Sequence, residues 1–243
     1  MEKTRYVVDL HVHTDLSNDG RSTIAKQAEA AAARGLDAIV ITDHNACALD
    51  APILQCGVWL FPGCEISTNS GHILGLFLEK KPDLAALRKN GLPTASDAVT
   101  VLRECGAVTA LAHPYTRKNA RPDAPVDLIE SANSRVYFKN PQANKQAEIL
   151  AVALGLPQVG GSDAHCSREV GNAYTSINTP DCSMSALRKA ILEGACEPVL
   201  KKNTPRRFKG YSQFRQARRG KNPIRIIIGI VYIAYCILLD ILS

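Results

Sequence analysis

Asp9-Leu10-His11-Val12-His13 is the stretch around which this chain is organised. It follows a short apolar run, so it is expected to form the carboxyl end of a β-strand. Alternate side chains of a strand point to the same face, so His11 and His13 are expected to project together. Neutral imidazole is a common ligand for zinc, iron and manganese, so the pair suggests half of a metal site. The alternative is a pair of structural histidines that bind nothing.

The formal charge of +6 is unevenly distributed along the 243 residues. Residues 201–221 contain nine Lys or Arg and no acid. When these nine, Arg225 and Asp240 are set aside, residues 1–200 carry 19 basic and 22 acidic side chains. The body of the chain is therefore mildly acidic, and the basic character belongs to its carboxyl-terminal part. The length suits one α/β barrel of about 200 to 250 residues.

The cysteines and the amino terminus suggest a cytoplasmic body. Eight cysteines are scattered without a Cys-x-x-Cys pair, which favours reduced thiols over a disulfide framework. Residues 1–5 are not followed by the apolar stretch of a secretory signal. We therefore expect the folded part of the chain to lie in the cytoplasm.

Apolar runs alternate with helical patterns along the first 200 residues, which predicts an α/β fold with a mostly parallel sheet. The expected strands are apolar runs at residues 6–8, 38–41, 58–61, 72–78, 108–111, 126–129 and 158–159. The expected helices cover residues 24–34, 96–104, 142–154 and 184–193. Most strands are followed by His, Asp or Glu at their carboxyl ends, where barrel enzymes place their active sites. His72 is the exception, because it lies at the start of its strand.

The histidines of the chain all lie at strand ends or beside a carboxylate or a turn. For any one of them, a structural role is the better interpretation. Six histidines together with three carboxylates indicate a multinuclear metal site instead. The set comprises His11, His13, His44, His72, His113, His165, Asp19, Glu65 and Asp163.

The motifs around these residues closely resemble the PHP domain, named for polymerases and histidinol phosphatases. In order, from residue 7 to about residue 195, they read His-x-His, Ser-Asn-Asp-Gly, Thr-Asp-His, Pro-Gly-x-Glu, Gly-His-Ile-Leu-Gly, Ala-His-Pro and Gly-Ser-Asp-Ala-His. The resemblance implies a distorted (β/α)7 barrel with a trinuclear metal site that hydrolyses phosphate esters. The most similar subgroup comprises nucleotide phosphatases and 5′-3′ exonucleases that act on short nucleic acids.

The resemblance also implies how the nine residues divide among three divalent ions, with manganese, zinc and iron as candidates. The first ion is assigned the ligands His11, His13, Glu65 and Asp163. The second ion shares Glu65 as a bridge and adds His72 and His113. The third ion is assigned Asp19, His44 and His165. A hydroxide that bridges two such ions can attack phosphorus in line.

Three further residues receive roles near this site. Arg117 could hold the substrate phosphate, and the alternative is a solvated loop arginine. Asp9 and Asp43 are close to ligand histidines in the sequence, so they could orient imidazoles or, equally, cap strand ends.

The chain departs from its exonuclease-like relatives between His72 and His113, where it is short and they carry an inserted subdomain. This departure argues against a long polynucleotide and favours a nucleotide or another small phosphomonoester. The alternatives are an exonuclease for short 5′-phosphorylated RNA or DNA, and a non-catalytic, metal-stabilised binding module.

The carboxyl-terminal part predicts a tether to an anionic membrane. After a barrel of residues 1–200, we expect a basic linker at 201–222 and a membrane-associated or transmembrane segment at 223–243. The 18 residues from Ile224 to Ile241 cover about 27 Å as a helix, near the lower limit for spanning a bilayer. The preceding basic residues would keep the catalytic domain cytoplasmic. The alternatives are single-stranded nucleic acid as partner of the linker, and a buried segment or oligomer contact.

Overall fold

A computed structural model describes residues 4–116 and 124–242 of the chain. Its strands are β1 Arg5–Val12, β2 Ala38–Ile41, β3 Ile53–Gln55, β4 Val58–Thr68, β5 Gly71–Leu76, β6 Val108–Ala112, β7 Leu128–Asn133, β8 Gln158–Gly161, β9 Ala173–Asn178 and β10 Cys196–Leu200. They form one sheet with the neighbour order β10-β9-β1-β2-β4-β5-β6-β7-β8, and β3 pairs with β4 outside this path.

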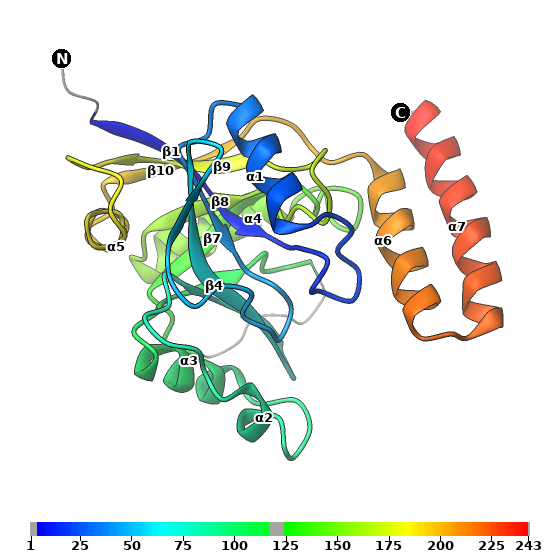
Figure 1. Cartoon of the computed structure of the whole chain (residues 1–243), viewed down its shortest axis with the longest axis horizontal. Coiled ribbons are helices and arrows are strands. Elements are labelled where there is room, and N and C mark those ends of the chain that lie inside the picture. The colour runs from blue at the N-terminus through cyan, green and yellow to red at the C-terminus, as the bar shows by residue number, and fades with distance from the viewer. Residues whose placement is uncertain (1–3, 117–123, 243) are drawn as a thin grey trace.

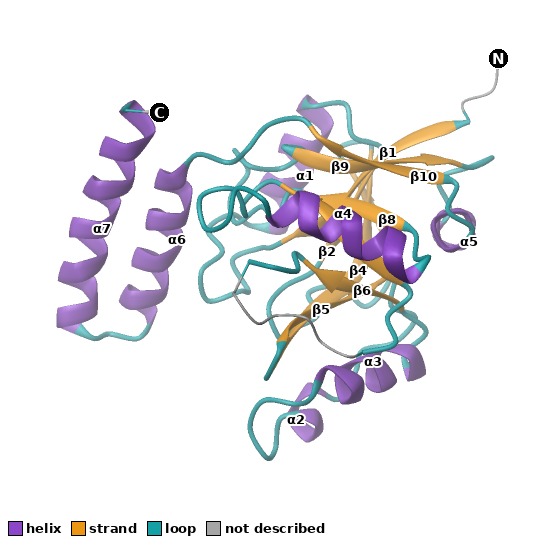
Figure 2. Ribbon diagram, turned by 180° about the vertical axis from the view of Figure 1, so that it is seen from behind, coloured by secondary structure: helices purple, strands orange, loops and turns teal. Residues whose placement is uncertain are grey.

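The helices lie around the outside of this curved sheet, as Figures 1 and 2 show from opposite sides. They are α1 Ile24–Ala33, α2 Leu84–Leu87, α3 Ala95–Glu104, α4 Ala143–Leu154, α5 Met184–Leu192, α6 Arg206–Arg219 and α7 Pro223–Ile241. Side-chain caps fix several of their starts. The hydroxyl of Thr23 accepts a hydrogen bond from the N–H of Lys26 at the start of α1, and Thr94 and Asp97 form a capping box in α3.

The sheet closes into a barrel where the end of β8 meets β1. The N–H of His13 donates to the carbonyl of Ala164 over 2.8 Å, and the N–H of Ala164 donates to the carbonyl of His11 over 3.3 Å. The buried carboxylate of Asp9 also accepts a hydrogen bond from the N–H of Ser162 at 2.8 Å. The distorted α/β barrel expected from the sequence is confirmed.

The sheet is mixed rather than mostly parallel, and the change of direction explains the position of His72. Strands β1, β2 and β4 are parallel, as are β6, β7 and β8. A tight turn joins Thr68 to Gly71 and makes β5 antiparallel to β4, and β5 is also antiparallel to its other neighbour, β6. His72 therefore pairs with Ser67 near the end of β4 and with Ala112 at the end of β6. The start of β5 thus lies where the parallel strands end.

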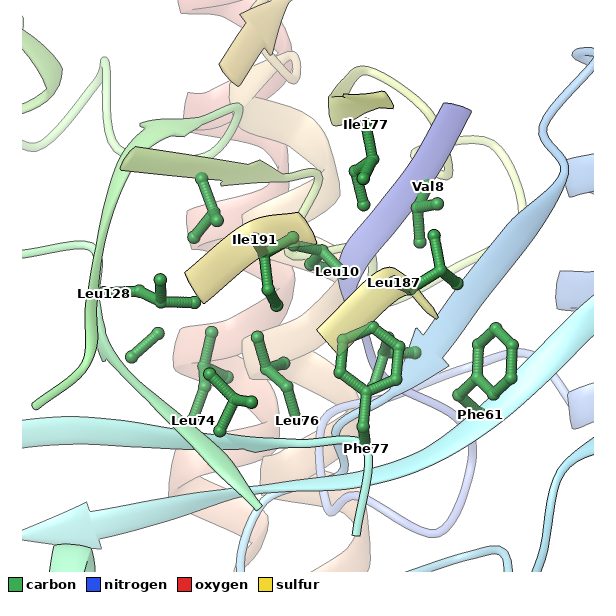
Figure 3. Close-up of a cluster of buried hydrophobic side chains, with 14 of the residues drawn as sticks. Val8, Leu10, Phe61, Leu74, Leu76, Phe77, Leu128, Ile177, Leu187 and Ile191 are labelled. Carbon is green, nitrogen blue, oxygen red and sulfur yellow. The ribbon is translucent and has the colours of Figure 1, made fainter. Parts of the chain in front are cut away.

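The opposite end of the barrel is filled with apolar side chains, which Figure 3 shows. Leu187 and Ile191 of α5 are fully buried against Leu10 of β1, Leu74 of β5 and Leu128 of β7. Burial of a large aliphatic side chain contributes about 1.5 to 3 kcal/mol to folding. The apolar core therefore occupies the α5 end of the barrel, and polar side chains gather at the other end.

The expected basic linker contains helix α6, which packs against α7 as an antiparallel hairpin beside the barrel (Figures 1 and 2). The carboxylate of Asp240 in α7 accepts hydrogen bonds from the first N–H groups of α6, at 2.7 Å from Arg206 and 3.0 Å from Arg207. A carboxylate at a helix amino terminus offsets the helix dipole. Helix α7 is long and apolar enough to cross a membrane. Only 11% of its most apolar stretch of 18 residues is buried inside the protein.

Candidate metal centre

All nine residues predicted as metal ligands lie at the end of the barrel opposite α5. They come from seven different positions of the fold, and most lie at or after the end of a strand. They are His11 and His13 at the end of β1, Asp19 in the next loop, His44 after β2, Glu65 in β4, His72 in β5, His113 after β6, and Asp163 and His165 after β8.

The four residues predicted to hold the first metal form one compact, buried group. The Nε2 atoms of His11 and His13 are 3.1 Å apart, and each lies 3.4 Å from Oε2 of Glu65. Oδ1 of Asp163 is 3.3 Å from Nε2 of His13 and 3.8 Å from Nε2 of His11. Ligand atoms about 2.1 Å from a shared cation are roughly 3.0 to 3.5 Å from one another. The spacing of these four donors fits one cation.

Glu65 also connects to the second group. Its Oε1 atom lies 2.7 Å from Nδ1 of His72 and 3.0 Å from Nε2 of His113. Both oxygens of this buried carboxylate therefore face imidazole nitrogens from different strands. A carboxylate that presents one oxygen to each of two donor groups has the geometry of a bridging ligand.

The third group has a looser arrangement. Oδ2 of Asp19 is 3.1 Å from Nε2 of His165 and 3.9 Å from Nε2 of His44. Nδ1 of His44 is 2.8 Å from Oε2 of Glu65, so His44 lies between the third group and the bridging carboxylate. The rings of His13 and His44 stack with centroids 4.4 Å apart. The three groups are therefore contiguous.

Unpaired donor atoms support the view that this set fits cations. Within residues 4–116 and 124–242, Oδ1 of Asp19 is buried without a hydrogen-bond partner, and Nδ1 of His44 and Oε2 of Glu65 are buried 2.8 Å apart without the geometry of a hydrogen bond. Most buried polar atoms in folded proteins are hydrogen-bonded. Lone pairs of carboxylate and imidazole that are buried together without such partners suit a divalent ion, and the chemistry of the donors matches zinc, manganese or iron.

The charges of the centre stabilise one another despite burial. Burial opposes ionisation of Glu65, yet the imidazoles of His44 and His72 hold its pKa well below the usual range. Burial likewise opposes ionisation of Asp163, and His11 and the hydrogen bond from His13 lower its pKa. Both carboxylates are therefore ionised at neutral pH, which is the form that binds a metal.

Glu130 in the middle of β7 contacts two of the predicted ligands, His11 and His113, a role that the sequence did not reveal. Its Oε1 atom lies 2.9 Å from Nδ1 of His11, and its Oε2 atom accepts a hydrogen bond from the N–H of His113 at 2.7 Å. Bonding at Nδ1 leaves Nε2 of His11 directed toward His13 and the carboxylates. The sequence feature that could have identified Glu130 is its place directly after the apolar pair Leu128-Ile129, because other predicted ligands also follow apolar strand residues.

Asp9 and Asp43 act on the backbone and on hydroxyl groups instead of on imidazoles. Asp9 accepts hydrogen bonds from the N–H groups of His11 and Ser162. Asp43 accepts from the N–H and the hydroxyl of Thr14 at 2.7 and 2.6 Å, and from Ser17. Of the two roles considered for these aspartates, the structure shows capping of strand ends and loops.

A cavity of about 620 Å³ lies over the ligands and has a cationic wall. Asp19, His44, His72, His113, Asp163 and His165 line one side. The other side includes Arg135, Lys139 and four residues of α6, namely Lys209, Ser212, Gln213 and Gln216. The sequence did not reveal the α6 wall, because its basic and polar composition resembles that of a solvated linker.

Lys209 and Arg135 are the best-defined cations of this wall. Burial lowers the pKa of Lys209 to about 7, and the nearby charges of Lys139 and Arg135 act in the same direction. The ammonium of Lys209 lies 4.6 Å from the centre of the Phe138 ring, and no described Asp or Glu pairs with it. Arg135 pairs with the buried Glu169 at 3.1 Å and donates to Ser212 of α6 at 3.3 Å.

Arg117, the predicted phosphate-binding arginine, lies outside the described residues. Its proposed role therefore stays a prediction.

The chain is similar to known proteins in sequence and in fold. The family of the PHP domain matches residues 9–116, and the PHP-associated family matches residues 141–196. An uncharacterized protein of Methanocaldococcus jannaschii is 30% identical over 184 residues, which cover 70% of this chain and 70% of that protein. A protein of Acetivibrio thermocellus named as a probable phosphatase is 29% identical and covers 82% of this chain and 97% of its own length.

Two solved structures share the fold. PsfC from Pseudomonas syringae superimposes with a TM-score of 0.62 at 22% identity, over 96% of this chain and 99% of PsfC. The lesion-specific endonuclease EndoQ from Pyrococcus furiosus superimposes with a TM-score of 0.59 at 20% identity, over 80% of this chain and 57% of EndoQ. Together with the family matches and the archaeal relative, the barrel and its donor clusters show that this chain belongs to the PHP domain family.

Proposed function

We propose that this protein is a metal-dependent phosphoesterase that hydrolyses a nucleotide or another small phosphomonoester. The convergence of nine residues with nitrogen and oxygen donors beneath one cavity carries this proposal. Membership of the PHP domain family and a relative named as a probable phosphatase support hydrolysis of a phosphate ester.

The proposed centre would hold three divalent ions of manganese, zinc or iron. The first would be held by His11, His13, Glu65 and Asp163. The second would be held by Glu65, His72 and His113, and the third by Asp19, His44 and His165. The distances within each group and the three buried donor atoms that make no hydrogen bond of good geometry support this division.

The bound ions would supply a hydroxide near neutral pH and would stabilise negative charge on the phosphate oxygens. The residues of the chain keep the ligands in place for this chemistry. Glu130 fixes the ring of His11 through Nδ1, and the same carboxylate anchors the backbone of His113. Fixed ligands reduce the reorganisation that the reaction needs.

The cationic wall supports an anionic substrate. Lys209 and Arg135 face the same cavity as Asp163 and His165. A phosphate placed between the metal ligands and this wall would meet positive charge on both sides. We therefore assign the ammonium of Lys209 to the binding of the substrate's anionic group.

An exonuclease for short 5′-phosphorylated RNA or DNA is the second candidate. The fold is similar to that of an endonuclease, and a cationic wall would also suit a nucleic acid backbone. Helix α6 covers one side of the cavity, which leaves less room for a long strand and favours the phosphomonoester.

The test uses the full chain, because α6 lines the cavity. The purified protein is supplied with manganese and incubated with nucleoside monophosphates, a model phosphodiester and a 5′-phosphorylated trinucleotide. We expect release of phosphate from the monoesters and none from an Asp163→Asn variant. Faster shortening of the trinucleotide would favour the exonuclease. A folded, metal-loaded protein without any turnover would favour the binding module.

A further inference from the structure

Helix α7 exposes a continuous apolar face that the rest of the chain does not cover. Nine of the twenty large apolar side chains exposed in the described residues belong to α7 and the residue that follows it. They are Ile224, Ile227, Ile228, Ile230, Val231, Tyr235, Leu238, Ile241 and Leu242. Successive residues of a helix are rotated by about 100°, so these side chains lie within an arc of roughly 160° around the helix axis. A patch of this extent marks an interaction surface.

The opposite face of α7 is fixed against α6 by close contacts at two glycines. A Cβ atom on Gly210 of α6 would lie 3.1 Å from Cα of Ile233, and one on Gly229 of α7 would lie 3.2 Å from Cα of Phe214. Such contacts bring the helix backbones close together. With Asp240 bound to the start of α6, they set which face of α7 points outward.

Positive charge surrounds the turn between the two helices. Arg218, Lys221 and Arg225 are exposed there, and residues 201–239 contain no Asp or Glu. Figures 1 and 2 both place α7 at the outer edge of the molecule, on the far side of α6 from the barrel. An apolar face bordered by exposed cations is complementary to the surface of an anionic bilayer.

We propose that α7 lies along the surface of an anionic membrane, with its apolar face among the acyl chains and with α6 facing the solvent. A spanning α7 would have to leave α6, since α6 carries six Arg or Lys that would otherwise enter the hydrocarbon. The hairpin thus acts as an in-plane anchor. This proposal does not depend on the reaction that the barrel catalyses.

A second copy of the chain fits this surface less well. In an antiparallel pair of α7 helices, the basic turn of each copy would face the carboxyl end of the other. The acid at that end, Asp240, already binds the backbone of Arg206 and Arg207. The cations would therefore lack a partner in a dimer and find one in an anionic lipid headgroup.

Vesicle flotation of the full chain tests the proposal. We expect binding to vesicles of phosphatidylcholine with about 30% phosphatidylglycerol, and about tenfold weaker binding to phosphatidylcholine alone. The double variant Ile227→Glu/Val231→Glu should abolish flotation with either vesicle. The matched control Leu192→Glu, on the exposed surface of α5, should float like the unchanged protein. Circular dichroism and thermal unfolding verify that each variant is folded.

Three results would overturn the proposal. The first is a folded protein that floats with neither vesicle. The second is a stable dimer in solution that the double variant converts to monomer, because the apolar face would then be covered by a second copy. The third is retention in cell membranes after extraction with alkaline carbonate, which would show that α7 spans the bilayer. Release into the carbonate supernatant is the result we expect.

Discussion

The Nδ1 atom of His11 lies 2.9 Å from Oε1 of Glu130, and both side chains are buried. This contact fixes the ring of a metal ligand on β1 from β7, and only β8 lies between these two strands in the closed barrel. Partners of this kind hold a ligand histidine in one tautomer and orientation. Loss of this contact is therefore expected to weaken metal binding.

Replacement of Glu130 by Gln should weaken metal binding by about 10- to 100-fold, because a neutral amide holds the imidazole less firmly. Metal titration of the chelator-treated protein measures the change. The control is Glu148→Gln, an exposed residue of α4 that pairs with Lys145. Equal metal affinity in the two variants would contradict the role of Glu130.

Replacement of Lys209 by Met should raise the KM for a phosphomonoester by about tenfold, because a charge-assisted hydrogen bond contributes about 1.5 to 3 kcal/mol. The kcat should change less, since the metal ligands stay intact. Steady-state kinetics give both constants. Lys26→Met on the exposed surface of α1 serves as control. An unchanged KM in the Lys209 variant would show that α6 does not bind the substrate.

The lowered pKa of Lys209 also predicts a dependence of KM on pH. The folded protein holds this pKa at about 7, below the ordinary lysine value of 10.5. The ammonium that attracts an anion is therefore present below pH 7 and is lost as the pH rises above it. KM should rise with pH in the unchanged protein. The ratio of the KM of the Lys209→Met variant to the KM of the unchanged protein should fall toward 1 as the pH approaches 9. A ratio that stays constant with pH would show that the titration of Lys209 does not cause the rise in KM.

Replacement of Arg135 by Ala should lower the free energy of unfolding by about 3 to 5 kcal/mol, because it leaves a buried carboxylate unpaired. The two side chains of the Arg135–Glu169 pair are only 8% and 0% exposed. The exposed pair of Arg5 and Glu197 offers a matched comparison, since Arg5→Ala should cost less than about 1 kcal/mol. Urea unfolding measures both. Similar losses would show that burial of the pair is unimportant.

Replacement of Gly210 by Val should separate α6 from α7 and raise KM, because a Cβ at this position presses on the backbone of Ile233. Gly220→Ala is the control, since a Cβ there meets its nearest neighbour at 3.6 Å, an ordinary contact. Limited proteolysis of the hairpin and steady-state kinetics report the two effects. An intact hairpin with unchanged KM in the Gly210 variant would contradict this coupling.

Much of the barrel could be predicted because its strands are short apolar runs that end in ligand residues. The helices expected at 96–104 and 142–154 correspond to α3 and α4 within about two residues. His72 could be assigned only through the family resemblance, since it lies at a strand start. The reversal of β5 brings it to the correct end of the barrel.

Strands β9 and β10 and helix α6 could not be predicted, for different physical reasons. In β9, Ala173, Thr175 and Ile177 are buried. Ala173 is small and Thr175 is polar, so the buried positions do not stand out as an apolar strand in the sequence. Helix α6 is polar and basic, and tertiary contacts with α7 and the barrel stabilise it. Such contacts join segments far apart in the chain, and a local pattern does not reveal them.

Metal-dependent phosphate release by the full chain tests the central claim most directly. The protein is treated with chelator, dialysed, and titrated with manganese or zinc while hydrolysis of a nucleoside monophosphate is followed. We predict that chelation abolishes activity, that added metal restores it, and that a Glu65→Gln variant stays inactive at every metal concentration. Phosphate release that survives chelation, or that Glu65→Gln retains in full, would contradict a catalytic metal centre at the end of this barrel.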